Sequence, residues 1–279
     1  MGFRDKHMSG GKLTSILRQT IWYLPTIFFL SGALWAEPIA VHYVEGTIHG
    51  FLVLRNADGE TLASGDLVQI AHGDRISTKL VYHFKDGSID DETTVYSQRG
   101  VFRLLKDHHI QKGPSFPHPL DLSLDTSTSQ VIVRSVNKDG KEEVATQHME
   151  LPADLANGLV STLIKNIPRD VSETKVSMLV ASPKPRLVKL AISHDGSESA
   201  SVAGSRLEAT RYLVKIEIGG VSGVVAPLVG KQPADTRVWI LGGEAPVFLK
   251  SLGPTQAEGP VWSSELMAPT WASTSSKEH

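Results

Sequence analysis

The chain has 279 residues, of which 41% are hydrophobic, and its formal net charge at pH 7 is −2. This composition supplies a packed core and excludes a wholly disordered chain, and the near-neutral charge argues against a nucleic-acid-binding protein. There is no cysteine, which excludes disulfide cross-links, thiol nucleophiles and cysteine-ligated zinc.

The first 36 residues have the order of an export signal. A leader containing Arg4, Lys6, Lys12 and Arg18 precedes an apolar segment, residues 21–35. This segment is short for a spanning helix, which needs about 20 apolar residues. Small residues follow, and cleavage after Ala33 or Ala36 fits a secretory signal. The sequence therefore predicts a signal peptide over residues 1–36 and a periplasmic protein. The alternative is an uncleaved signal that anchors the protein, and membrane contact is expected through this segment alone.

Residues 41–149 predict consecutive strands joined by tight turns. Asp-Gly pairs at 58–59, 86–87 and 139–140 each separate two runs in which apolar and polar residues alternate. Such a pair between alternating runs is typical of a β-hairpin, because its central residues adopt positive φ. Residues 98–100 predict a further turn. This half of the chain is therefore expected to form an antiparallel meander.

Residues 152–166 predict a single amphipathic helix. Leu155, Leu159 and Leu163 recur at a spacing of four and would form one apolar stripe. Gly158 lies in the interior of this predicted helix, where glycine costs about 1 kcal/mol relative to alanine. We therefore expect a close neighbour at Gly158.

Strand patterns resume over residues 175–266. His194-Asp195-Gly196 predicts a turn, and residues 242–245 predict a hairpin turn. The tail, residues 268–279, is rich in Ser, Thr and Ala and is expected to be flexible.

The expected fold is mainly β, with one domain over residues 37–267. A single helix within a long antiparallel run predicts a curved antiparallel sheet, or incomplete β-barrel, wrapped on that helix. Two β-sandwich-like halves joined through the helix are the alternative.

The export signal, the hairpin-rich chain, the central helix and the closing Gly-Pro-Val-Trp-x-x-Glu-Leu strand at residues 259–266 carry a family resemblance. Together they resemble uncharacterised exported β-rich proteins of Gram-negative-type bacteria. Those proteins are in turn similar to the periplasmic lipoprotein carriers, whose fold is an incomplete β-barrel closed by helical segments. The resemblance implies this architecture over most of residues 41–267, and it implies no individual site residue.

Candidate chemistry is sparse. His108, His109 and His118 lie in a predicted loop, residues 106–119, and are candidate metal ligands. Adjacent histidines on a strand would point to opposite faces, so we expect solvated histidines here. The carboxylates of residues 90–92 offer calcium ligands but lack the alternation of an EF-hand loop, which favours a solvated turn. No nucleotide, nucleophile or zinc-protease motif occurs, so the sequence identifies no catalytic residue and predicts no cofactor.

Large apolar side chains offer a lining for a cavity between helix and sheet, although packing in a filled core is the alternative. These cavity candidates are Tyr82, Phe84, Phe102, Leu155, Leu159, Tyr212, Trp239 and Trp262.

Three function hypotheses follow. The first is an exported, non-enzymatic binding or carrier protein for a lipid or other apolar or amphipathic ligand. The second is an envelope structural or assembly factor that binds another protein through sheet edges. The third is a hydrolase or metal-dependent enzyme whose carboxylates and histidines converge only in space.

Overall fold

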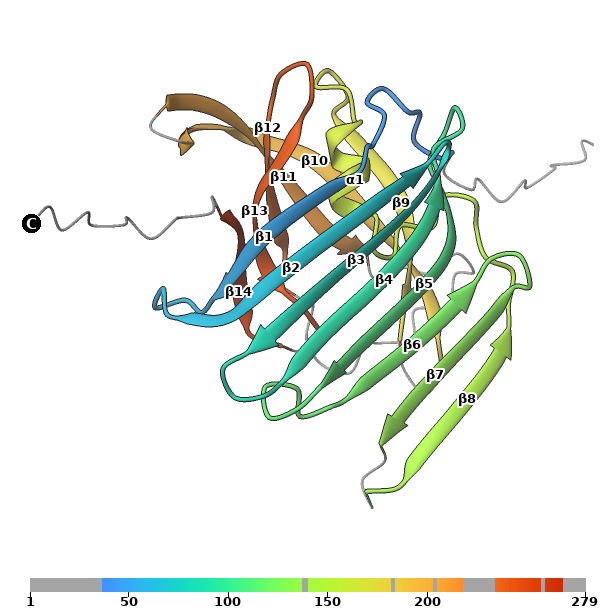
Figure 1. The fold of residues 1–279 in the computed structure, drawn as a ribbon. Coiled ribbons are helices and arrows are strands. Elements are labelled where there is room, and N and C mark those ends of the chain that lie inside the picture. The colour runs from blue at the N-terminus through green and yellow to red at the C-terminus, as the bar shows by residue number, and fades with distance from the viewer. Residues whose placement is uncertain are drawn as a thin grey trace, which may run out of the picture. The chain divides into compact units, whose positions relative to one another are not determined.

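A computed structural model describes residues 37–136, 140–181, 184–202, 205–217, 234–256 and 259–267. These residues form strands and one short helix (Figure 1). The predicted signal peptide and the predicted flexible tail lie outside the described residues, so both stay predictions.

The first half of the described chain is an eight-stranded antiparallel meander, in which each strand pairs with the next. Its strands are β1 (Ile48–Arg55), β2 (Thr61–His72), β3 (Arg75–Phe84), β4 (Ile89–Ser97), β5 (Arg103–Lys112), β6 (Leu120–Asp125), β7 (Gln130–Val136) and β8 (Glu142–His148).

The second half contains the helix and a six-stranded antiparallel meander. Its elements are α1 (Val160–Lys165), β9 (Glu173–Val180), β10 (Arg186–Val202), β11 (Ser205–Glu217), β12 (Thr236–Leu241), β13 (Val247–Pro254) and β14 (Val261–Met267).

The two meanders join through their first and last strands. Strand β1 pairs antiparallel with β14, from Phe51 opposite Met267 to Arg55 opposite Ser263. The result is one 14-stranded sheet in the order β8-β7-β6-β5-β4-β3-β2-β1-β14-β13-β12-β11-β10-β9. Strands β8 and β9 are its two ends, so the sheet is not closed. The predicted mainly-β, incomplete-barrel architecture is confirmed, and the sheet is not divided into two sandwiches.

The connecting segment, residues 149–172, runs from β8 at one end of the sheet to β9 at the other and contains α1 (Figure 1). Its apolar side chains pack into one cluster with inward residues from both meanders. Because one short segment must contact strands of both meanders, the sheet curves around it. Leu155, Leu159 and Leu163 are each at most 3% exposed, so the predicted apolar stripe is buried.

The predicted extent of the helix, residues 152–166, was wrong. Helix α1 covers only Val160–Lys165, because Gly158 has a φ of +65°, outside the right-handed helical region. Before Gly158, the backbone hydrogen-bonds to β9. The N–H of Ala156 donates to the carbonyl of Ser177 at 2.8 Å, and the N–H of Ser177 donates to the carbonyl of Asp154 at 3.2 Å. This half of the predicted helix instead pairs with part of an edge strand.

Most predicted turns are confirmed. Gly59, Gly87 and Gly140 have positive φ between consecutive strands, although Asp139 lies outside the described residues. The turn predicted at His194-Asp195-Gly196 was wrong. These residues lie inside β10, where the register against β11 shifts between His194 and Ser197. Pairing with β11 continues on both sides of this bulge, so the strand does not reverse.

No helix among the described residues combines the length and apolar character needed to cross a bilayer.

Candidate ligand pocket

A pocket of about 450 Å³ lies where the connecting segment leaves α1. Its walls come from four places in the chain. These are the segment before β1, residues 37–47, which we call the lead-in; the end of α1 and the residues after it; strands β11 and β12; and the β12–β13 hairpin. The lining residues are His42, Tyr43, Lys165, Asn166, Ile167, Pro168, Arg169, Thr210, Tyr212, Ile240, Gly242, Gly243 and Pro246. We call this the α1 pocket.

Asn166 fixes the lead-in as one wall of the α1 pocket. Its side-chain Oδ1 accepts the backbone N–H of His42 at 2.9 Å and that of Tyr43 at 2.7 Å. Its Nδ2 donates to the carbonyl of Thr162 at 3.0 Å. Lys165, also in this wall, forms an ion pair with the buried Glu45. The Asn166 amide and the Lys165 ammonium therefore stabilise this wall through partners within the protein.

Strand alternation places Thr210 and Tyr212 on the inward face of β11. Thr210 is 2% exposed and lies opposite Ile240 of β12. Its Oγ1 has no hydrogen-bond partner within the described chain. A buried hydroxyl without a partner costs about 1–3 kcal/mol, so an occupant that hydrogen-bonds to it would recover this cost.

Arg169 is the exposed cation of the α1 pocket. A Cβ built on Gly242 would lie 2.4 Å from Nη2 of Arg169, so the guanidinium lies directly against the backbone at Gly242. Burial raises the pKa of Tyr212, the Arg169 charge opposes this shift, and Tyr43 adds to it. The arginine charge and the two phenols are therefore close enough to interact electrostatically.

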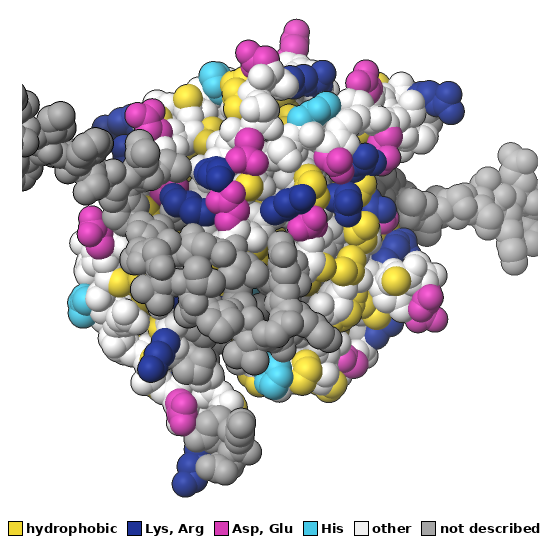
Figure 2. Space-filling model, turned by 180° about the vertical axis from the view of Figure 1, so that it is seen from behind, with side chains coloured by type: hydrophobic (Ala, Val, Ile, Leu, Met, Phe, Trp, Pro, Cys, Tyr) yellow, Lys and Arg dark blue, Asp and Glu magenta, His cyan; other side chains and the backbone are white. Residues whose placement is uncertain are grey.

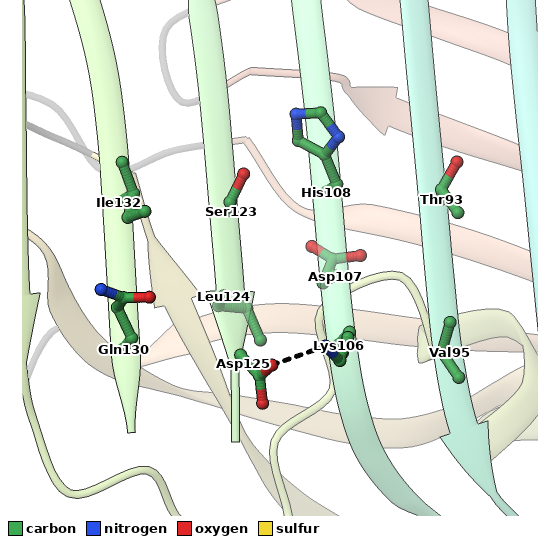
Figure 3. A pocket seen from close by; sticks show the side chains of 10 residues that line it. All are labelled: Thr93, Val95, Lys106, Asp107, His108, Ser123, Leu124, Asp125, Gln130 and Ile132. Atoms are coloured by element: carbon green, nitrogen blue, oxygen red, sulfur yellow. Dashed lines mark ion pairs between the residues drawn. The ribbon is translucent and has the colours of Figure 1, made fainter. Parts of the chain in front are cut away.

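A second hollow, of about 320 Å³, lies over β4, β5, β6 and β7 (Figure 3). Lys106 and Asp125 form an ion pair of 2.7 Å within it. His108 also lines the groove, and Oδ1 of Asp121 accepts a hydrogen bond from its Nε2 at 3.1 Å. Lys106 and Asp125 are therefore paired with each other, whereas Asp107, which also lines the groove, keeps one carboxylate oxygen without a hydrogen-bond partner in the described chain.

The loop predicted over residues 106–119 was wrong for its first part, because residues up to Lys112 belong to β5. The two adjacent histidines point to opposite faces, as strand geometry requires. His108 lies in the groove of Figure 3, whereas Nε2 of His109 lies 2.7 Å from Oδ1 of Asp90. His118 does not line this groove. The histidines and carboxylates of the predicted enzyme site therefore do not converge there.

Residues 90–92, predicted as a solvated turn, lie in β4. Asp91 pairs with Lys79 at 3.1 Å, whereas Asp90 and Glu92 share the inward face with His109 across the β4–β5 pair. Burial lowers the pKa of His109, but Glu92, Asp90 and Asp107 outweigh it and raise the value to about 9. Burial also raises the pKa of Glu92.

Asp107 completes this inward polar cluster. It is 2% exposed, and its Oδ1 accepts a hydrogen bond from the Thr94 hydroxyl at 2.9 Å. Burial and the charge of Glu92 raise the pKa of Asp107 to about 8, although Thr94 and His109 oppose the shift. Its Oδ2 has no hydrogen-bond partner in the described ranges. Within those ranges, no three acidic or histidine side chains are placed to hold a metal ion.

A buried polar triad joins the connecting segment to the β9–β10 pair. Nζ of Lys189 lies 2.9 Å from Oδ2 of Asp154 and 2.8 Å from Oγ of Ser177. Oγ of Ser177 lies 2.9 Å from Oδ1 of Asp154. Ser177 is 1% exposed and, unlike Thr210, lines neither of the two hollows, so its hydroxyl is not part of a candidate ligand site. The triad therefore anchors the segment.

All eight predicted cavity candidates are buried, and of these Tyr212 lines the α1 pocket. Phe102, Leu155 and Leu159 pack in the cluster around the connecting segment, whereas Tyr82, Phe84 and Trp262 pack in a second cluster with β1 and Phe116. Trp239 alternates with the inward Val238 and Ile240, so it points to the other face of β12. There it lies beside Lys250, whose Nζ is 5.6 Å from the ring centroid.

Thr210, Arg169 and Gly242 could not be recognised as site residues from the sequence. They come from separate elements, and no spacing links them. The Gly242-Gly243 pair was visible only as a hairpin turn.

The surface seen in Figure 2 carries basic and acidic side chains intermixed over its described part. Ion pairs among the described residues include those of Asp195 with Arg211 at 2.9 Å and with Arg237 at 3.3 Å.

No family model matches the sequence, and no curated protein matches it. Among solved structures, the chain is similar to a beta-barrel-like protein of domain of unknown function DUF1849 from Brucella abortus. The TM-score is 0.44 at 8% sequence identity, over 82% of this chain and 100% of the other.

Proposed function

We propose that the protein is a non-enzymatic binding or carrier protein for an amphipathic ligand in the bacterial envelope. The α1 pocket carries this proposal. Its volume of about 450 Å³ falls in the range of small-molecule sites, about 300–1,000 Å³. It combines apolar walls with a buried hydroxyl and a cation that are unpaired in the described chain.

The apolar part of the proposed site comes from Ile167, Pro168, Ile240 and Pro246. Such side chains would take the hydrocarbon part of a ligand, whereas Thr210 and Arg169 would take its polar part. The predicted signal peptide supports an envelope location, and the resemblance to lipoprotein carriers favours an apolar cargo.

The test uses N-phenyl-1-naphthylamine, an uncharged apolar dye that fluoresces when it leaves water. The full chain is produced with its own leader in a Gram-negative host and purified from the periplasm. We expect saturable binding of one dye per protein, together with a co-purified lipid in native mass spectrometry. A protein that binds neither dye nor lipid would show that the proposed function is wrong.

A substitution locates the bound dye. Pro246 lies in the β12–β13 connection and lines the α1 pocket, so Pro246→Trp should fill the pocket and weaken dye binding at least tenfold. Pro117 lies in the exposed β5–β6 connection and lines neither hollow, so Pro117→Trp should bind like the wild type. Equal loss in both variants, or in neither, would place the dye elsewhere.

A second candidate function, an envelope assembly factor, is favoured by β8. This strand ends the sheet, and Val144 within it is 57% exposed. An exposed edge strand can add a strand from another protein. A photoreactive residue at Val144 should then crosslink one envelope protein in cells, whereas the same residue at Ile70, which is 43% exposed on β2, should not. Crosslinking at neither position would remove this candidate.

A further inference from the structure

The charges that line the α1 pocket are of one sign. Lys165 and Arg169 are its charged lining residues, and no Asp or Glu is among the described residues that line it. The Lys165 charge is balanced by Glu45. Arg169 forms no ion pair within the described ranges, and its exposed sequence neighbour Asp170 and the hairpin residue Glu244 do not pair with it. The pocket therefore keeps one uncompensated positive charge.

Two further features favour an anion at that charge. The guanidinium is a planar donor whose geometry matches carboxylate and phosphate oxygens. The buried Thr210 hydroxyl, unpaired in the described chain, can donate a hydrogen bond to the same occupant. Gly242 leaves open the space in which the guanidinium lies.

We propose that the α1 pocket selects single-chain amphiphiles with a compact anionic head group, which Arg169 and Thr210 bind while the chain contacts the apolar walls. This inference rests on the proposed function. The pocket volume is at the lower end of the range for small-molecule sites, which favours one hydrocarbon chain. Carboxylate and phosphate share the required chemistry, so a fatty acid and a lysophospholipid-like monoester are its two sources.

The test is displacement of bound N-phenyl-1-naphthylamine by four compounds with the same twelve-carbon chain, each used below its micelle concentration. Dodecanoate and dodecyl phosphate carry anionic heads, dodecanol is uncharged, and dodecyltrimethylammonium is cationic. The wild type should release the dye at least tenfold more readily to one or both anionic compounds than to dodecanol or dodecyltrimethylammonium. The better of the two anions identifies a carboxylate or a phosphate source.

Two variants assign the preference to the arginine. Arg169→Gln removes the charge and should reduce the anion preference to less than twofold. Gly242→Ala keeps the charge but places a Cβ where Nη2 of Arg169 lies, so it should also weaken anion binding at least threefold. The side chain can move at its flexible end, so we expect this variant to keep wild-type stability.

Matched controls exclude general effects of the two substitutions. Arg103 is exposed on β5 and does not line the pocket, so Arg103→Gln should keep the preference. Gly46 has nothing within 4 Å of a built Cβ, so Gly46→Ala should keep it too.

The possible failures are distinct. If the dye does not bind, the proposed function fails first. If the dye binds but all four compounds displace it equally, the proposed binding function stands and the proposed selection of anionic head groups is wrong. If Arg169→Gln weakens all four compounds by the same factor, Arg169 only shapes the pocket, and the proposed anion contact is overturned.

Discussion

Gly158 sets the fit between the connecting segment and the sheet. A Cβ at this position would lie 2.0 Å from Oγ1 of Thr94 and 3.0 Å from Oδ1 of Asp107. The backbone at Gly158 also has a φ of +65°, where residues with a Cβ are strained. Glycine is therefore required at position 158 for two reasons: the positive φ of the backbone and the lack of space for a Cβ.

Gly158→Ala should destabilise the protein by about 2–4 kcal/mol, the sum of the backbone strain and of overpacking against β4 and β5. Urea unfolding measures the change. Gly59 has a φ of +82° but nothing within 4 Å of a built Cβ, so Gly59→Ala should cost about 1–2 kcal/mol from the backbone alone. Equal losses in the two variants would contradict the close contact at Thr94.

Asp107 should make stability fall as the pH rises. Its pKa is 3.8 in the unfolded chain and about 8 in the folded protein. Between these values the folded state binds more protons than the unfolded state. The stabilising contribution is therefore fully present below about pH 4 and is lost as the pH rises through 8, by at most about 1.4 kcal/mol per unit.

Asp107→Asn should remove this slope. Urea unfolding at pH 5, 6.5 and 8 should show the stability of the variant relative to wild type rising at each step. Asp125 is the control, because hydrogen bonds from Lys106 and Ser127 lower its pKa to about 2, so Asp125→Asn should give a constant difference over this range. Parallel curves for Asp107→Asn and wild type would contradict the raised pKa.

At the scale of elements, the connecting segment depends on its buried anchor. The Asp154 side chain is 0% exposed and that of Lys189 is 14% exposed. Asp154→Ala leaves a mostly buried ammonium without its carboxylate and should cost about 3–5 kcal/mol of unfolding free energy. The double variant Asp154→Ala with Lys189→Met should cost less than Asp154→Ala alone. Additive losses in this double-mutant cycle, measured by urea unfolding, would show that the pair does not interact.

The elements differ in how well the sequence predicts them. Alternation and Asp-Gly pairs locate the hairpins near Gly59 and Gly87, because these signals are local. The leucine spacing correctly predicts a buried stripe but not its conformation, since Gly158 and the edge of β9 decide that through contacts distant in sequence. The α1 pocket could not be predicted for the same reason, because Arg169 and Thr210 line one pocket only after the sheet has curved.

At the scale of the whole molecule, the β1–β14 pair makes the two meanders one structure. Leu54 of β1 is 1% exposed and packs in a cluster with Tyr82 of β3 and Trp262 of β14. The Tyr82 hydroxyl also hydrogen-bonds to Ser264. Side chains of both meanders therefore stabilise this junction.

Leu54→Ala should cost about 2–5 kcal/mol and should lower hydrogen-exchange protection in β5 and β11 together. Val144→Ala, at the exposed end of the sheet, should change stability by less than about 0.5 kcal/mol. Loss of protection confined to β1 and its neighbours would mean that the two meanders open separately.

The pairing of the first strand with the last also sets the order of events during synthesis. Phe51 has no partner on β14 until Met267 is available, so the strand pair that joins the two meanders must form late. Contacts between distant parts of a chain form slowly because loop closure costs entropy first. For a chain exported as proposed, the two meanders would therefore join only after the last strand has crossed the membrane.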